Sequence, residues 1–193
     1  MKLSGSYQIN LEKQKVWEAL NDPEILKQAI PGCEEFTKNS DTEFTAKATN
    51  KIGPFNASFT GDIELNDLNP PNSYKISGSG NSPVGFASGE ANVKLEDHQN
   101  GTKLTYEVEA NVGGKIAQVG SRLIDMTAKK MADIFFGKFS EIISKDKIKS
   151  KEDIGDGEEK SNIQITDDKK PNQRILIYSA AIATAAILIF FIF

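Results

Sequence analysis

Short runs in which apolar and polar positions alternate fill the first two thirds of the chain, as expected of strands that bury one face. The run from Leu3 to Ile9 predicts a first strand. Two short helices are predicted next. Asn10 is the expected N-cap of the first, and the sequence Asp22-Pro23-Glu24 carries the start signals of the second, namely a capping carboxylate, proline at the first helical position and an acid in the first turn.

Alternation resumes at residues 55–65, 74–80, 85–95 and 104–112, which predicts a series of antiparallel strands. The turn signals fall between these runs. Residues 69–72 read Asn-Pro-Pro-Asn, and residues 97–101 end in Asn-Gly, a pair expected to supply positive φ angles in a hairpin. His98 is therefore expected on a surface turn.

The glycine pair Gly113-Gly114 is predicted to end the sheet and to precede a long helix. One apolar stripe runs along this helix at helical spacing, formed by Ile124, Ala128, Met131, Phe135, Phe139 and Ile142. A sheet with one buried face needs a cover, and this helix is the element long enough to supply it. The predicted fold is α+β, a helix-grip arrangement in which a curved antiparallel sheet wraps around a long C-terminal helix, with two short helices after the first strand.

The end of the chain predicts a membrane anchor. Residues 175–193 contain no charged side chain, and 19 residues in a helix span about 28 Å, close to the roughly 30 Å hydrocarbon core of a bilayer. Residues 146–174 are rich in charge and lack a sustained apolar period, which predicts a disordered tether after a folded domain of residues 1–145. Lys169, Lys170 and Arg174 precede the span, and they predict a single-pass anchor in the cytoplasmic membrane with the folded domain facing the cytoplasm.

The amino-acid composition argues against several kinds of partner and site. The formal net charge is -4, which argues against a nucleic-acid partner because such proteins present a basic stripe. One Cys and one His cannot form a Cys/His zinc cluster or an internal disulfide, so no metal site is predicted. Cys33 is expected to be a small buried residue in a turn rather than a redox sensor.

Small residues gather on one face of the strand at 85–95 and at the start of the long helix. Because a densely packed core needs large side chains opposite small ones, this pattern predicts a cavity between the sheet and the helix. The alternative is that glycine lets bent strands approach closely. The expected lining comprises small residues (Gly85, Gly89, Ala91, Gly120, Thr127), apolar residues (Phe36, Phe55, Phe59, Phe86, Ile116, Val119, Leu123, Ile124) and, at the mouth, Pro31, Gly32, Gly113 and Gly114. Few acid-base groups are expected near it, only Tyr7, Tyr106, Arg122 and Asp125, so no catalytic residue is predicted and binding is favoured over catalysis.

Six stretches in order resemble the G-subunit family of carbon monoxide dehydrogenase, within the START/Bet v 1-like helix-grip superfamily. The resemblance covers residues 1–145 almost from end to end, and its most specific stretch is the last of the six. The stretches are Val16–Glu24, Ile30–Glu34, Lys51–Phe55, Gly78–Gly80, Gly85–Ala91 and Val112–Ile124.

This resemblance implies an accessory subunit rather than an enzyme. The family implies docking of a molybdenum hydroxylase, such as carbon monoxide dehydrogenase, at the membrane. It also implies an exchangeable menaquinone-like quinone as cargo, with no tightly bound cofactor, so that electrons pass to the quinone pool of the membrane. Two alternatives stay open at this point. One is a general hydrophobic-ligand or lipid-binding protein, and the other is a polyketide cyclase-like enzyme that uses Tyr7 or Tyr106 with Arg122.

Overall fold

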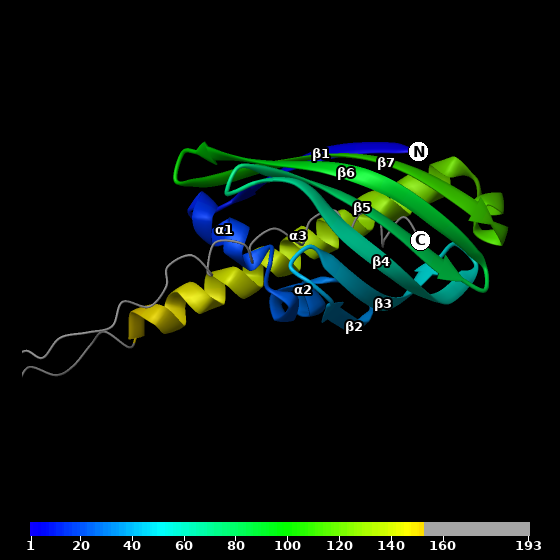
Figure 1. The fold of residues 1–193 in the computed structure, drawn as a ribbon, viewed down its shortest axis with the longest axis horizontal. Coiled ribbons are helices and arrows are strands. Elements are labelled where there is room, and N and C mark those ends of the chain that lie inside the picture. Colours follow the sequence, from blue (N-terminus) through cyan, green and yellow to red (C-terminus); the bar gives the residue numbers. More distant parts are fainter. Residues whose placement is uncertain (153–193) are drawn as a thin grey trace, which may run out of the picture.

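The computed structural model describes residues 1–152, with side chains for residues 1–145 (Figure 1). The predicted anchor at 175–193 and most of the predicted tether lie outside the described residues. The last helix runs to Glu152, so residues 146–152, predicted as part of the tether, are helical. Within residues 1–152, no helix combines the length and the apolar character needed to cross a bilayer.

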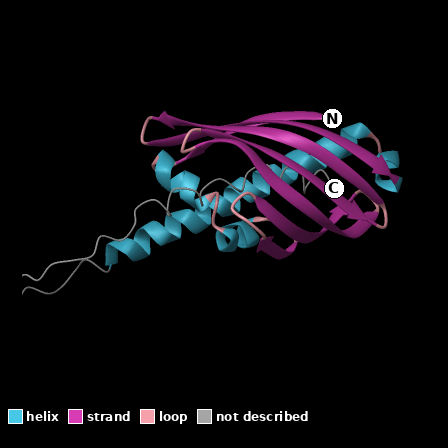
Figure 2. Ribbon diagram, in the orientation of Figure 1, coloured by secondary structure: helices cyan, strands magenta, loops and turns pink. Residues whose placement is uncertain are grey.

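Seven strands and three α-helices form the described part, together with one short 3₁₀ helix, η1. The sheet has the strand order β1-β7-β6-β5-β4-β3-β2, and all neighbours are antiparallel. Figure 2 shows the strands as one layer that curves over the long helix α3. The elements are β1 (Lys2–Ile9), α1 (Lys13–Ala19), α2 (Pro23–Ala29), β2 (Cys33–Lys38), β3 (Glu43–Ile52), β4 (Phe55–Asn69), β5 (Ser73–Ser82), β6 (Gly85–His98), β7 (Gly101–Gly114), η1 (Lys115–Val119) and α3 (Ser121–Glu152).

The predicted architecture is confirmed for this part of the chain: a curved antiparallel sheet encloses a long helix, and two short helices follow the first strand. The predicted apolar stripe of α3 faces the core, with Ala128, Phe135 and Phe139 completely buried. Ala132 and Phe136, also buried, widen this face. We call the side of the sheet that faces α3 the inner face.

The start of the second short helix is confirmed, whereas the predicted start of the first is wrong. The carboxylate of Asp22 accepts hydrogen bonds from the backbone N–H groups of Glu24 (2.8 Å) and Ile25 (3.4 Å), as expected of an N-cap. Helix α1 begins at Lys13 rather than directly after Asn10, and no side chain caps it. The reason is tertiary: Leu11 is buried, and its carbonyl accepts a hydrogen bond from the Thr102 hydroxyl at 2.7 Å, which keeps Leu11 out of the helix.

Both predicted turns occur, but one has different backbone angles. Residues 70–72 connect β4 to β5, and His98 lies exposed at the end of β6 as predicted. In that hairpin the positive φ belongs to Gln99 (49°), not to the Asn-Gly pair. Gly101 already belongs to β7, where it is needed for a close approach, because a Cβ there would lie 2.2 Å from the carbonyl oxygen of Ile9.

The long helix also begins later than predicted. Strand β7 continues through Gly114, and η1 follows before Gly120 and the first residue of α3 at Ser121. Gly114 (φ 83°) and Gly120 (φ 89°) have backbone angles that favour glycine, so each interrupts regular structure. Ile116 and Val119 therefore lie on η1, and Ile116 is fully buried.

Candidate ligand-binding site

The register of the sheet places small residues next to one another across four strands. Ala46 of β3 pairs with Gly61 of β4, Gly61 with Gly80 of β5, and Gly80 with Ala87 of β6. The neighbouring row joins Gly78, Gly89 and Ala110. We call these seven residues the small-residue patch; its three alanines are buried on the inner face.

Helix α3 also places small side chains on its buried face. Ala128 and Ala132 are completely buried, one helical turn apart. Ile124 is 5% exposed and lies one turn before Ala128. Thr127 is half-buried, and its hydroxyl donates to the carbonyl of Leu123 at 2.8 Å, which satisfies the donor within the helix. Buried small residues therefore occur both on the inner face of the sheet and on α3.

Two glycines of the patch have different surroundings. A Cβ added at Gly89 would lie 2.5 Å from the Glu109 carbonyl oxygen and 2.9 Å from the Ala110 Cβ, so glycine there permits a close approach of β6 to β7. A Cβ at Gly80 would lie 3.6 Å from the nearest atom, the carbonyl oxygen of Thr60, which is an ordinary contact. Close approach of neighbouring strands thus explains why residue 89 is glycine, but it does not explain why residue 80 is glycine.

Gly113 and Gly114 of the predicted mouth lie at one end of the molecule, where the β3–β4 turn reaches η1 and α3. Gly53 in that turn has φ 58°, and a Cβ there would lie 3.0 Å from Leu123 and 3.4 Å from Val119. Both of these apolar side chains are half-buried. At the same end a Cβ on Gly85 would lie 2.3 Å from the Gly113 carbonyl oxygen and 2.7 Å from Ile116.

The predicted aromatic wall is brought together only in part. Phe36 and Phe59 are buried, and Phe36 stacks on Phe44 with ring centroids 5.8 Å apart. Phe55 is half-buried at the start of β4 on the same face as Phe59.

The placement of Phe86 on this wall is wrong. Because side chains alternate along β6, its neighbours Gly85 and Ala87 face inward, while Phe86 is 51% exposed on the opposite face. There its ring covers Gly113, whose added Cβ would lie 2.4 Å from it.

Four further predicted residues remain to be placed. Gly32 (φ 70°) lies over β3, where the Thr49 N–H donates to the Gly32 carbonyl at 2.9 Å. Pro31 is half-buried beside it, and Ala91 is fully buried on β6. Gly120 is exposed, and a Cβ there would meet no atom within 4 Å, so it is not part of an enclosed wall.

One residue that sequence reasoning missed is Asn50. It lies on the inner face of β3, is 8% exposed, and its amide nitrogen has no hydrogen-bond partner among the described residues. The signal was present in the sequence: inward positions 44, 46, 48 and 52 of this strand are apolar, and position 50 breaks the series.

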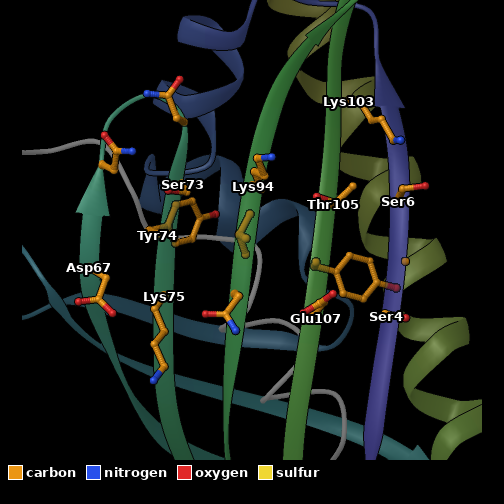
Figure 3. Close-up of a pocket in the computed structure, with 16 residues that line it drawn as sticks. Ser4, Ser6, Asp67, Ser73, Tyr74, Lys75, Lys94, Lys103, Thr105 and Glu107 are labelled. Carbon is orange, nitrogen blue, oxygen red and sulfur yellow. The ribbon is translucent and has the colours of Figure 1, made fainter.

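Three hollows on the described part of the chain lie along the other, outer face of the sheet. Their volumes are about 720, 470 and 900 Å³. Figure 3 shows the first, where Lys75, Lys94 and Lys103 stand among serine, threonine and acidic side chains of neighbouring strands. Of the predicted pocket residues only Gly89 lines one of these three hollows. They are lined mainly by polar residues and are separate from the predicted apolar site.

Of the predicted acid-base candidates, Tyr7 and Tyr106 lie together, with stacked rings 6.1 Å apart, but Arg122 does not join them. The Tyr7 hydroxyl donates to the carboxylate of Asp133, and the Tyr7 ring stacks on Phe136 with centroids 3.9 Å apart. Burial raises the pKa of the Tyr7 phenol, and the hydrogen bond to Asp133 raises it further. Arg122 is exposed at the start of α3, eleven residues before Asp133, or about 16 Å along the helix. Tyr7 of β1 and Arg122 of α3 therefore lie apart and do not form the predicted pair.

Cys33 is half-buried at the start of β2, and its thiol donates to the Glu35 carbonyl at 3.4 Å. Burial raises the pKa of this thiol to about 11, although the Lys27 cation acts in the opposite direction. The thiolate, which is the nucleophilic form, is therefore scarce near neutral pH.

The fold places this chain in the class of helix-grip proteins, in which a curved antiparallel sheet encloses a long C-terminal helix. The sequence profile of the CoxG family, the G-subunit family of carbon monoxide dehydrogenase, matches residues 5–144. The chain belongs to this family. A comparison with the curated proteins gave no match.

Solved structures agree on the fold. A conserved protein from Geobacillus kaustophilus is 31% identical, with a TM-score of 0.72; the match covers 75% of this chain and 96% of that one. Two remoter neighbours show the fold alone. The Zhui aromatase/cyclase from Streptomyces sp. R1128 is 12% identical, with a TM-score of 0.53 and coverage of 75% and 93%. Ara h 8.0201 is 15% identical, with a TM-score of 0.53 and coverage of 75% and 98%.

Membership of this family, on a fold that encloses a helix within a sheet, supports a role in binding a hydrophobic molecule. The family's name implies association with carbon monoxide dehydrogenase.

Proposed function

We propose that this protein is a membrane-anchored accessory subunit that holds a lipophilic molecule between the inner face of the sheet and α3. The observation that carries the proposal is the small-residue patch on the inner face of the sheet, to which α3 adds buried alanines of its own. Protein interiors are packed as densely as organic crystals, so small side chains on both sides of a layer leave volume for a guest. Half-buried Val119 and Leu123 give this layer an apolar entrance at one end.

The cargo that we propose is a menaquinone-like quinone, exchanged with the bilayer rather than tightly bound. The partner that we propose is a carbon monoxide dehydrogenase-like molybdenum hydroxylase, which would keep the redox cofactors and pass electrons through the cargo to the quinone pool. The name of the family supports this partner. In this arrangement the chain acts as a carrier and a docking subunit, and it catalyses no reaction itself.

The predicted anchor at 175–193 would hold the domain at the cytoplasmic membrane. Features at the entrance support this orientation: Phe86 is 51% exposed and Met126 is 61% exposed near the end where η1 meets α3. Lys115 and Arg122 are exposed at the same end. Apolar side chains flanked by cations suit the surface of an anionic bilayer.

The direct test is to purify the full-length protein from its native membrane in mild detergent, extract it with organic solvent and identify the extract by mass spectrometry. We expect a prenylated quinone in an amount comparable with the protein. Gly80→Leu should abolish recovery, because Gly80 has room for a side chain that would fill the patch. The matched control is Ser79→Leu, on the exposed face of the same strand.

Equal recovery from both variants and the parent would contradict the interior site. Recovery of phospholipid or fatty acid in place of quinone would favour the alternative of a general lipid-binding protein. A chemically altered polyketide-like product would favour the cyclase-like alternative.

A further inference from the structure

The inner face of β3 contains one polar side chain among apolar ones. Phe44, Ala46, Ala48 and Ile52 are each 2% exposed or less, and Asn50 in the same series is 8% exposed. Asn50 is therefore the one polar side chain that β3 turns toward the proposed site. A buried amide in such a place is costly unless it is hydrogen-bonded, so its partners require an account.

The amide of Asn50 is only partly accounted for by the protein. Its oxygen lies against the Pro31-Gly32 turn, since a Cβ on Gly32 would be 2.9 Å from Oδ1. The backbone bond from Thr49 to Gly32 holds this turn over the strand. The other amide atom, Nδ2, is buried and has no hydrogen-bond partner among the described residues. An unpaired buried donor of this kind costs about 1–3 kcal/mol.

The position of Asn50 links it to the proposed site. Along β3 it lies four residues from Ala46 of the small-residue patch and three residues from Gly53. A Cβ on Gly53 would lie 3.0 Å from Leu123 and 3.4 Å from Val119, at the proposed entrance. At about 3.3 Å per residue, Asn50 is within roughly 10–13 Å of both the patch and the entrance. A guest that extends from one to the other passes this donor.

We propose that Nδ2 of Asn50 is the hydrogen-bond donor that recognises a carbonyl oxygen on an otherwise apolar guest. The ligand class is a neutral ketone, quinone or ester with a long apolar body. A guest without a hydrogen-bond acceptor leaves Nδ2 unpaired, so it binds less well than a guest with a carbonyl oxygen. Asn50 therefore determines which apolar molecules bind and does not raise the affinity for all of them. This inference rests on the proposed function, because it assigns a role within the same site.

The test uses two fluorescent probes that differ only in the acceptor: 6-dodecanoyl-2-dimethylaminonaphthalene, which has a ketone, and its 6-dodecyl analogue, which does not. Both are titrated into the full-length protein and into Asn50→Leu, a substitution of similar size. We expect Asn50→Leu to weaken binding of the ketone probe about tenfold and to change binding of the alkyl probe by less than about twofold. The matched control is Asn56→Leu, on the exposed face of β4, which should bind both probes like the parent.

A second measurement separates recognition from a structural role. Replacing an unpaired buried amide with an apolar side chain should leave the melting temperature unchanged or raise it. A melting temperature lowered by several degrees would assign Asn50 a structural partner and overturn the proposal. Equal loss of both probes, or no loss of either, would also overturn it while the proposed function stands. If neither probe binds the parent protein, the proposed function fails together with this inference.

Discussion

Gly80 and Gly89 occupy neighbouring strands and the same inner face, yet their backbones have different surroundings. Strand β7 approaches Gly89 so closely that a Cβ would lie 2.5 Å from a carbonyl oxygen. At Gly80 the nearest atom would be 3.6 Å away. Neither glycine has a positive φ angle, so the difference arises from space alone and not from backbone conformation.

We expect Gly89→Ala to lower the free energy of unfolding by about 1–3 kcal/mol, since the added methyl group forces two strands apart. Gly80→Ala should be neutral or stabilise the protein by up to about 1 kcal/mol, because it reduces the entropy of the unfolded chain without a clash. Urea unfolding followed by circular dichroism measures both. Similar destabilisation by the two substitutions would show that the small-residue patch is as tightly packed at Gly80 as at Gly89.

Residue identities alone located only part of the candidate site. Small residues on alternate positions of β6 were sufficient to predict a patch, because alternation depends only on the local period of a strand. The same rule places Phe86 on the outer face. Asn50 was visible as a break in an alternating series, but its unpaired nitrogen depends on the turn at Gly32, which precedes it by 18 residues.

At the scale of elements, the edge strand β1 is joined to α3 by contacts between aromatic and polar side chains. Tyr7 donates to Asp133 and stacks on Phe136. Tyr106 of β7 adds a third ring, 6.0 Å from Phe136. These contacts hold the middle of the helix on the sheet, whereas the first turns of α3 lie at the entrance of the proposed site.

Tyr7→Phe should lower the free energy of unfolding by about 0.5–1.5 kcal/mol, because it removes the hydroxyl but keeps the stacked ring. Denaturant unfolding of this variant, of Asp133→Ala and of the double variant gives the coupling energy between the two side chains. Additive effects would show that the hydrogen bond contributes nothing measurable. Probe binding at the entrance should be unchanged in all three variants.

The helix starts show which element boundaries local chemistry can specify. The boundary of α2 was predictable because Asp22 caps it through atoms two and three residues away. The boundary of α1 was not, because it depends on Thr102, which is 91 residues from Leu11 in sequence. The start of α3 was shifted in the same way by η1, whose Ile116 is buried against Gly85.

At the scale of the whole molecule, charge is distributed unevenly. The chain carries a formal net charge of -4, but residues 51–55, 84–86 and 113–130 together contain five cations and one acid. These segments meet at the end that includes η1 and the start of α3, on the right of Figure 1. Phe86 and Met126 are exposed in the same segments. Helix α1 lies at the other end.

We expect this end of the molecule to contact an anionic membrane. The full-length Cys33→Ser protein would be labelled with an environment-sensitive fluorophore at Met126→Cys and mixed with phosphatidylglycerol vesicles. Its emission should shift to the blue, and the shift should shrink at high salt and in Lys115→Glu, because screening and charge reversal weaken the attraction. The same label at Gln14→Cys on α1 is the matched control. Equal shifts at both positions would contradict this orientation.

Strands β1 and β4 to β7, the buried stripe of α3 and the surface turn at His98 followed from periodicity and turn chemistry, because these depend on residues close together in sequence. Strands β2 and β3 were not predicted as separate elements. The register that joins Ala46, Gly61, Gly80 and Ala87 into one patch did not follow. Nor did the different surroundings of Gly80 and Gly89, or the unpaired amide of Asn50. Each of these depends on which atoms meet across strands that are distant along the chain, and only the folded sheet brings those atoms together.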